Sequence, residues 1–175
     1  MDGFLDCYDR VLRVVTRLAA MLAGLCILAT AFIIVYEIIM RGLFHAPTEW
    51  VLEISTYFII AAGFLGLAYT FRQGAHVQVD FVTMRLSAPV RCGLEIVGDI
   101  MAVLLFLIFM TESMDLVLAS FDFNKLSPSI LRFPLWIPQF SLVVGSALLL
   151  LEIVRRILMD IRCLKTGKYD EERQG

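Results

Sequence analysis

Long stretches without a charged side chain divide this sequence. Three of them cover 18–36, 54–71 and 135–151, and a shorter one covers 100–111. An α-helix rising about 1.5 Å per residue needs about 20 apolar residues to cross a hydrocarbon core about 30 Å thick. Only 18% of the residues are charged and 59% are apolar, which is unlike a water-soluble domain. The pattern predicts an all-α integral membrane protein with four transmembrane helices, over about 18–40, 50–71, 96–120 and 134–154.

The third predicted span is the least regular of the four. Its charge-free core of 12 residues is flanked by Glu95 and Asp99 on one side and by Glu112 and Asp115 on the other. Residues 96–121 contain no proline and are compatible with a helix throughout. We therefore expect a long tilted helix that carries these acids near its two ends, where they reach water or a basic partner, rather than in mid-membrane.

Amphipathic segments are expected to accompany the spans at one membrane surface. Apolar residues recur at helical spacing over 1–17, which predicts an interfacial helix that runs into the first span. Asp80 has the position of an N-cap for a second interfacial helix, over 81–86. Residues 1–164 are thus predicted to form one membrane domain, followed by a charged, disordered tail over 165–175.

The other surface should carry two connections. Thr48 is expected to act as the N-cap of the second span. Pro134 lies where the fourth span should begin, and Trp136 fits the belt of aromatic residues found at membrane surfaces. Small residues four apart permit close helix packing, either within the bundle or against a partner, as in the pairs Ala20 and Gly24, and Ala62 and Gly66.

Lysines and arginines are unevenly divided between the two sides. Twelve of the 15 fall in the N-terminal flank, the 72–91 connection and the C-terminal tail. The other side has three, which are Arg41, Lys125 and Arg132. Because cytoplasmic flanks carry the excess of basic residues, both termini and the 72–91 connection are predicted to be cytoplasmic.

Glu37 is the acid nearest to the first charge-free run. It could be a protonatable group in a transport path, or it could form an ion pair with Arg41, four residues further on. An acid placed N-terminal to a base at this spacing is the favourable order in a helix. The spacing favours the ion pair, which would anchor the outer end of the first span.

The residue types needed for catalysis are not arranged in this sequence as a catalytic site would require. The two histidines, His45 and His76, lie in connections on opposite sides, which argues against a haem held between helices. We find no clustered cysteines, phosphate-binding loop or nucleophile–base pair, and no basic aromatic patch for nucleic acid. The sequence therefore predicts neither an enzyme nor a metal or cofactor site.

Two motifs point to a known family. The first runs from Arg41 through Trp50 and Glu53 to the strip RQGAHVQVD over 72–80, and the second is LRFPLWIP over 131–138. Together with the length and the four spans, they resemble the small membrane subunit of TRAP transporters, the DctQ-like family.

This resemblance implies a tripartite, sodium-coupled, ATP-independent importer of an organic acid in the bacterial inner membrane. In such a system a periplasmic binding protein captures the substrate, and a large multi-span subunit binds sodium and moves the substrate across the membrane. The small subunit would lie among membrane lipids and support the large one as a scaffold. The residues expected to serve structure or the partner interface are Glu37, Arg41, Trp50, Glu53, Arg72, His76, Asp80, Pro134 and Trp136.

A second functional class fits the same number of spans. A self-contained, proton-coupled exporter of the small multidrug type also has four helices, and works as a homodimer. It requires a membrane-buried carboxylate that is free to exchange protons, and Glu37 is the nearest candidate. The sequence favours the scaffold subunit, because its acids are expected at the ends of the spans.

Overall fold

Four long helices make up the computed structural model, which describes residues 2–46, 48–73 and 88–166. They are α1 (Asp2–Leu43), α2 (Trp50–Arg72), α4 (Ala88–Asp122) and α5 (Trp136–Thr166). Each contains a segment long and apolar enough to cross a membrane, namely Cys7–Leu43, Trp50–Arg72, Ile96–Asp122 and Trp136–Met159. The predicted all-α fold with four membrane spans is confirmed.

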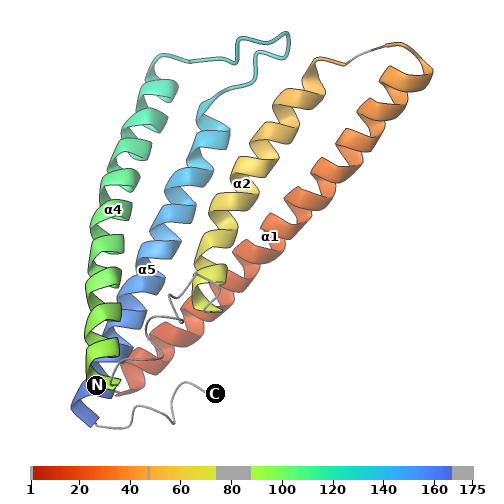
Figure 1. Cartoon of the computed structure of the whole chain (residues 1–175). Helices are drawn as coiled ribbons and strands as arrows, with labels where there is room; N and C mark the ends of the chain where they lie inside the picture. The colour runs from red at the N-terminus through yellow and green to blue at the C-terminus, as the bar shows by residue number, and fades with distance from the viewer. Residues whose placement is uncertain (1, 47, 74–87, 167–175) are drawn as a thin grey trace.

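The helices stand side by side in the order α4, α5, α2, α1 (Figure 1). The inner helices α2 and α5 pack on each other and each supports one outer helix, whereas α1 touches α5 over a short stretch only. We term the end where α1 begins and α5 ends the terminal face. The opposite end, with the connections 44–49 and 123–135, is the loop face. Because the helices form a row, α1 and α4 are edges with wide outward surfaces.

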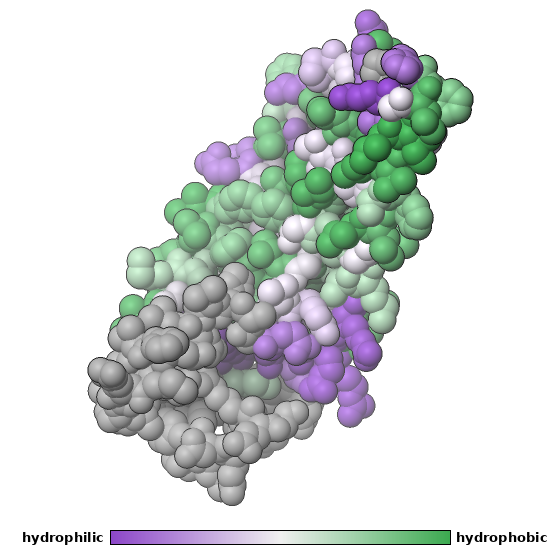
Figure 2. All heavy atoms as spheres, turned by 45° about the vertical axis from the view of Figure 1, so that its right-hand side comes forward, coloured by the Kyte–Doolittle hydropathy of each residue, from purple (hydrophilic) through white to green (hydrophobic). Residues whose placement is uncertain are grey.

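Most of the apolar surface points outward. Between 11% and 33% of the residues in each spanning window are buried within the chain. Figure 2 shows a broad hydrophobic band between two hydrophilic ends. Such a surface is unstable in water and requires lipid or a protein partner around it. The band therefore agrees with a membrane protein.

The inner pair of helices is held together by an unusually close approach. A Cβ atom built on Gly145 of α5 would lie 2.4 Å from the backbone carbonyl oxygen of Phe64 on α2. Glycine at this position lets the two backbones meet. Gly66 likewise faces Ala23 of α1, with 3.8 Å between the built Cβ and that of Ala23. A Cβ built on Gly24 would meet nothing within 4 Å, so among the described residues Gly24 makes no close approach to a neighbouring helix.

The best-packed apolar core lies toward the terminal face. Ala68 and Phe71 of α2 and Leu149 and Ile153 of α5 are each at most 8% exposed and form one cluster. Residues from α4 pack against the same cluster, among them Ala102, Val103 and Phe106. Three helices therefore share their apolar contacts at this end of the row.

The expected segmentation at the N-terminus is not confirmed. α1 is continuous from Asp2 to Leu43, so 1–17 does not form a helix separate from the first span. Its residues Leu12 and Thr16 are buried, which means that this part packs against protein. The predicted helix over 81–86 and the residues after Thr166 lie outside the described part of the chain, and α5 includes the first two residues of the predicted tail.

The connection between α4 and α5 is a narrow hairpin. Leu126 and Pro134 form an antiparallel bridge, and the backbone N–H of Ser127 donates to the carbonyl of Phe133 at 2.9 Å. α5 begins at Trp136 rather than at Pro134, because Pro134 belongs to this hairpin. The backbone contacts fix the hairpin at the loop face.

Candidate functional site

Four ionisable side chains from three helices meet at the terminal face. Arg72, the last residue of α2, donates to Asp9 of α1 at 2.5 Å and to Glu152 of α5 at 2.8 Å. Arg155 donates to Glu152 at 2.7 Å and to Asp9 at 3.2 Å. These two cations and two anions form a closed ring, which we term the terminal cluster.

The terminal cluster is withdrawn from solvent. The side chain of Glu152 is 0% exposed, and those of Asp9, Arg72 and Arg155 are between 12% and 15% exposed. Charges in such surroundings are stable only when each has a partner, because desolvating an ion costs several kcal/mol. The Tyr8 hydroxyl also donates to the Leu151 carbonyl, at 3.0 Å. The cluster therefore fixes α1, α2 and α5 relative to one another.

A second ion pair at the terminal face attaches α4. Arg156 of α5 lies 3.3 Å from the carboxylate of Asp99, which is 6% exposed as a residue. The Arg156 guanidinium also lies 5.3 Å from the centre of the Phe71 ring, within the range of a cation–π contact. Ionisable side chains thus connect all four helices at this end.

Arg72 is the only member of the terminal cluster that was predicted from the sequence as a structural or interface residue, as part of the strip over 72–80. Its partners Asp9, Glu152 and Arg155 were not predicted, and they lie 63 or more residues away from it in the sequence. The available signal was that Glu152 lies directly after the charge-free run 135–151, as Arg72 lies directly after the run 54–71. The other two candidates of the strip, His76 and Asp80, lie outside the described residues.

Glu37 joins the end of α1 to the connection that follows it. It accepts from Arg41 at 3.0 Å and from the backbone N–H of Thr48 at 3.2 Å, and the Thr48 hydroxyl donates to the same carboxylate. The expected ion pair with Arg41 is therefore present. The side chain of Arg41 is 70% exposed, so the pair lies at the surface of the chain.

The predicted N-cap of α2 is wrong. The residue at the cap position is Glu49, and its side chain makes no capping hydrogen bond. Thr48 lies one residue before this position, and its hydroxyl donates to Glu37. A charged carboxylate is a strong acceptor, which explains why Thr48 turns toward Glu37.

Glu53 holds the α4–α5 hairpin against the start of α2. The Tyr57 hydroxyl donates to Glu53 at 2.6 Å, and the Ser129 hydroxyl of the hairpin donates to the other carboxylate oxygen. The ring of Phe133 lies 5.6 Å from that of Tyr57. Glu53 therefore has partners on its own helix and on the hairpin.

The two tryptophans flank these contacts. Trp50 lies 5.9 Å from the Tyr36 ring of α1, and Trp136 lies 5.9 Å from the Phe121 ring of α4. Each tryptophan thus joins the start of one helix to the end of another. Both are 37% exposed and lie at the loop face, as expected for residues of an interfacial belt.

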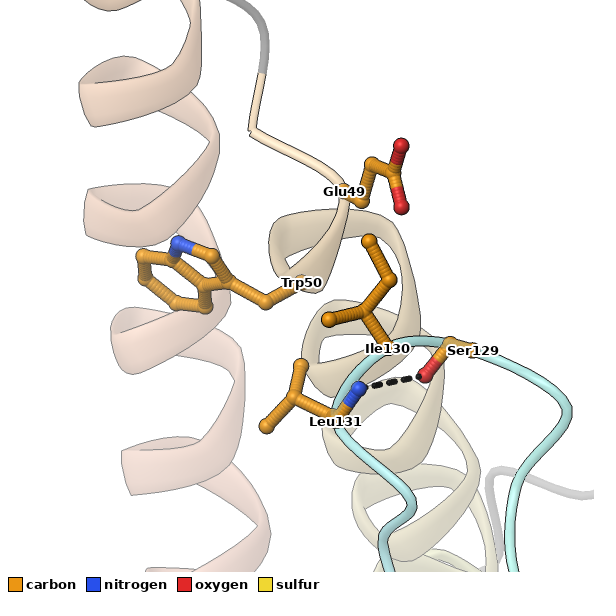
Figure 3. A pocket seen from close by; sticks show the side chains of 5 residues that line it. All are labelled: Glu49, Trp50, Ser129, Ile130 and Leu131. Atoms are coloured by element: carbon orange, nitrogen blue, oxygen red, sulfur yellow. Dashed lines mark hydrogen bonds between the residues drawn. The ribbon is translucent and has the colours of Figure 1, made fainter.

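A pocket of about 540 Å³ opens between the start of α2 and the hairpin. Its lining is mainly apolar and comprises Glu49, Trp50, Ser129, Ile130 and Leu131 (Figure 3). The Leu131 backbone N–H donates to the Ser129 hydroxyl at 3.3 Å, which shapes one wall. The hydrogen bonds of Ser129 to Glu53 and Leu131 fix this wall, and Ile130 at 80% exposure forms its apolar rim.

Contacts between helices give the level of Glu112 along the helix row. The ring of Phe109 stacks on that of Phe64 at 5.4 Å, and Gly145 abuts the Phe64 backbone. Phe109, Phe64 and Gly145 therefore share one level. Glu112 lies three residues from Phe109 toward the loop face, a rise of about 4.5 Å.

Three residues from Phe64 and Gly145 toward the loop face lie positions within two residues of the centres of the charge-free runs 54–71 and 135–151. Glu112 is therefore level with the apolar middle of the neighbouring helices. Its predicted place near the outer end of the span stays a prediction. Asp115 lies one turn further toward the loop face, and both acids are exposed.

Four apolar spans, with ionisable side chains that join the helix ends, define a multi-pass helical membrane protein. The family model described as "Tripartite ATP-independent periplasmic transporters, DctQ component" matches residues 30–163. The chain belongs to this family of transporter components. The resemblance seen in the sequence is confirmed.

Individual relatives are 26% to 29% identical to this chain over the aligned residues. The ectoine TRAP transporter small permease protein TeaB of Halomonas elongata is 26% identical over 150 residues, which are 83% of this chain and 76% of that protein. The C4-dicarboxylate TRAP transporter small permease protein DctQ of Rhodobacter capsulatus is 29% identical over 100 residues, 57% of this chain and 44% of that one. The sialic acid TRAP transporter permease protein SiaT of Haemophilus influenzae is 28% identical over 80 residues, 46% of this chain but only 13% of that permease.

Proposed function

We propose that this chain is the small subunit of a tripartite, sodium-coupled importer of an organic acid, and that it supports the large transport subunit as a scaffold. The observation that carries the proposal is the family match over residues 30–163, which runs from within α1 to near the end of α5. The names of three relatives mention sialic acid, ectoine and C4-dicarboxylate, all of which contain a carboxylate. An organic acid is therefore the substrate class we assign.

The placement of the buried ionisable groups supports a scaffold role. Asp99 and Glu152 are the buried acids of the described helices, and both pair with arginines that join one helix to another. Buried acids held in such pairs stabilise one fixed arrangement of the helices. In this proposal sodium ions bind in the large subunit, and a periplasmic solute-binding protein delivers the substrate to the assembled complex.

The alternative function, a self-contained proton-coupled exporter, has less support. Glu37 is engaged by Arg41 and Thr48, and Glu112 lies on an outward face of an edge helix rather than between helices. A proton-coupling acid must be reachable by both proton and substrate, which requires a polar path through the protein. The family match and these placements favour the importer subunit.

A test of the proposed function is uptake in cells that lack this chain. The substrate is first identified by the thermal shift of the binding protein with a panel of organic acids. Uptake of that acid should then require the binding protein, the large subunit and this chain, and should stop when sodium is replaced by potassium. Undiminished uptake without this chain would contradict the proposal.

The same assay distinguishes the two roles considered for Glu37. Glu37→Gln keeps one acceptor oxygen for Thr48 but weakens the ion pair with Arg41, whose side chain is 70% exposed. We expect uptake to remain within about twofold of the wild type, with normal amounts of subunit in the membrane. Abolished uptake at normal subunit levels would instead indicate a coupling acid.

Orientation follows from the division of basic residues. We place this chain in the bacterial inner membrane with both termini in the cytoplasm and the loop face toward the periplasm. A reporter active only in the periplasm should work when inserted at His45 and fail when fused after Gly175. The opposite result at both positions would invert this assignment.

A further inference from the structure

The two edge helices of the row differ in the surface that they offer to the membrane. The outward surface of α1 includes the charge-free run 18–36. The outward surface of α4 is also apolar for most of its length, but Thr111, Glu112 and Asp115 interrupt it. Its apolar members are 50% to 68% exposed, namely Val97, Met101, Leu104 and Ile108, which lie three or four residues apart, and Leu118 beyond the two acids.

Glu112 and Asp115 have no partner in the part of the chain that the structure describes. Both side chains are exposed, and neither makes a hydrogen bond or ion pair with another described residue. The opposite surface of α4 packs on α5 through buried residues such as Ser113 and Val117. The two acids therefore face away from the row, at the level of its apolar middle.

Lipid is an unfavourable neighbour for this surface. Ionisable side chains at mid-membrane depth are costly against hydrocarbon and normally face protein or a water-filled cavity. A second copy of this chain, packed α4 against α4, would bring four carboxylates together, and like charges repel. Charge complementarity instead requires a neighbour that carries a cation or several hydrogen-bond donors at the same depth.

We propose that this face of α4, with Glu112 and Asp115, is the docking surface for the large permease subunit. The occupant is one of its membrane-spanning helices, which carries an arginine or lysine that pairs with the two carboxylates. The apolar residues on either side pack along the same helix, while the outward surface of α1 faces lipid. This inference rests on the proposed function and adds the face and the chemistry of the contact.

The first test locates the neighbour by photo-cross-linking in membranes that contain the full complex. Benzoylphenylalanine is introduced in place of Ile108 on α4 or, as the matched control, in place of Leu25 on α1. These side chains are 64% and 63% exposed. Ile108 should give a cross-link to the large subunit and Leu25 should not. A cross-link from Leu25 alone, a cross-link between two copies of this chain at Ile108, or no protein cross-link at Ile108 would each overturn the proposal.

The second test removes the charges but keeps the shapes. In the double variant Glu112→Gln with Asp115→Asn, the amount of large subunit recovered from detergent with this chain should fall roughly tenfold. The reason is that the basic side chain of the large subunit is left buried without a charged partner. Asp122→Asn, at the exposed end of the same helix, is the matched control and should leave recovery unchanged.

Undiminished recovery of the double variant would overturn the charge pairing even if Ile108 cross-links. Failure of the wild-type chain to recover any large subunit would instead contradict the proposed function itself. The two failures are therefore distinguishable.

Discussion

Glu152→Ala should lower the free energy of unfolding of the chain by about 3–5 kcal/mol, because it removes an anion from a buried ring of charges. Arg72 and Arg155 would then share Asp9 as their remaining partner in the terminal cluster. The change also leaves a cavity where a side chain with 0% exposure had been. Unfolding of the purified chain in detergent can be followed through the fluorescence of Trp50 and Trp136.

Arg13→Ala provides the control for this prediction. Arg13 pairs with the same Asp9 at 2.7 Å, but its side chain is 67% exposed. Pairs of this kind contribute about 1 kcal/mol or less, so the variant should unfold almost as the wild type does. Equal effects of Glu152→Ala and Arg13→Ala would show that burial of the terminal cluster does not stabilise the helix row.

Gly145→Ala should be the second strongly destabilising change. The added Cβ would lie 2.4 Å from the carbonyl oxygen and 2.7 Å from the Cβ of Phe64, so α2 and α5 must move apart. Overpacking of this kind costs about 1–3 kcal/mol, which exceeds the gain of up to about 1 kcal/mol from alanine's helix propensity. The expected result is a lower unfolding midpoint in detergent.

Gly63→Ala is the matched substitution for this test. Gly63 precedes Phe64 on α2, but a Cβ built on it meets nothing within 4 Å. It should therefore unfold no more easily than the wild type. A Gly145→Ala protein as stable as Gly63→Ala would contradict the close approach of α2 and α5.

The spans could be predicted from the sequence because the membrane imposes a length on apolar segments. The charge-free runs 18–36 and 54–71, and 135–151 apart from its first residue, lie inside helices that can cross it. The lateral order of the helices could not be predicted, since apolar residues surround each helix and no single face is marked. Gly145 and Gly66 do lie on contact faces, but each glycine indicates a contact only once the opposite residue is known, which is Phe64 for Gly145 and Ala23 for Gly66.

The polar contacts were predictable only where they are local. Glu37 and Arg41 are four residues apart and could be paired from their spacing. Arg72 and Glu152 are 80 residues apart, and their contact depends on the order of the helices. Thr48 was assigned to a cap by its position, but the cap position is Glu49 and the Thr48 hydroxyl donates to Glu37.

The level of Glu112 in the helix row could not be predicted from the charges of α4. The run 100–111 ends just before Glu112, whereas the segment long and apolar enough to cross a membrane is Ile96–Asp122. The contact of Phe109 with Phe64 supplies the register that the composition of α4 does not contain.

If this chain functions as one subunit of a larger permease, native mass spectrometry of the detergent-extracted complex should detect both subunits together. The chain carries the affinity tag and is expressed together with its large permease subunit. We predict a complex that contains one copy of this chain and one large subunit. A tagged chain recovered only as a dimer of itself, although the large subunit is present in the same membranes, would contradict the account.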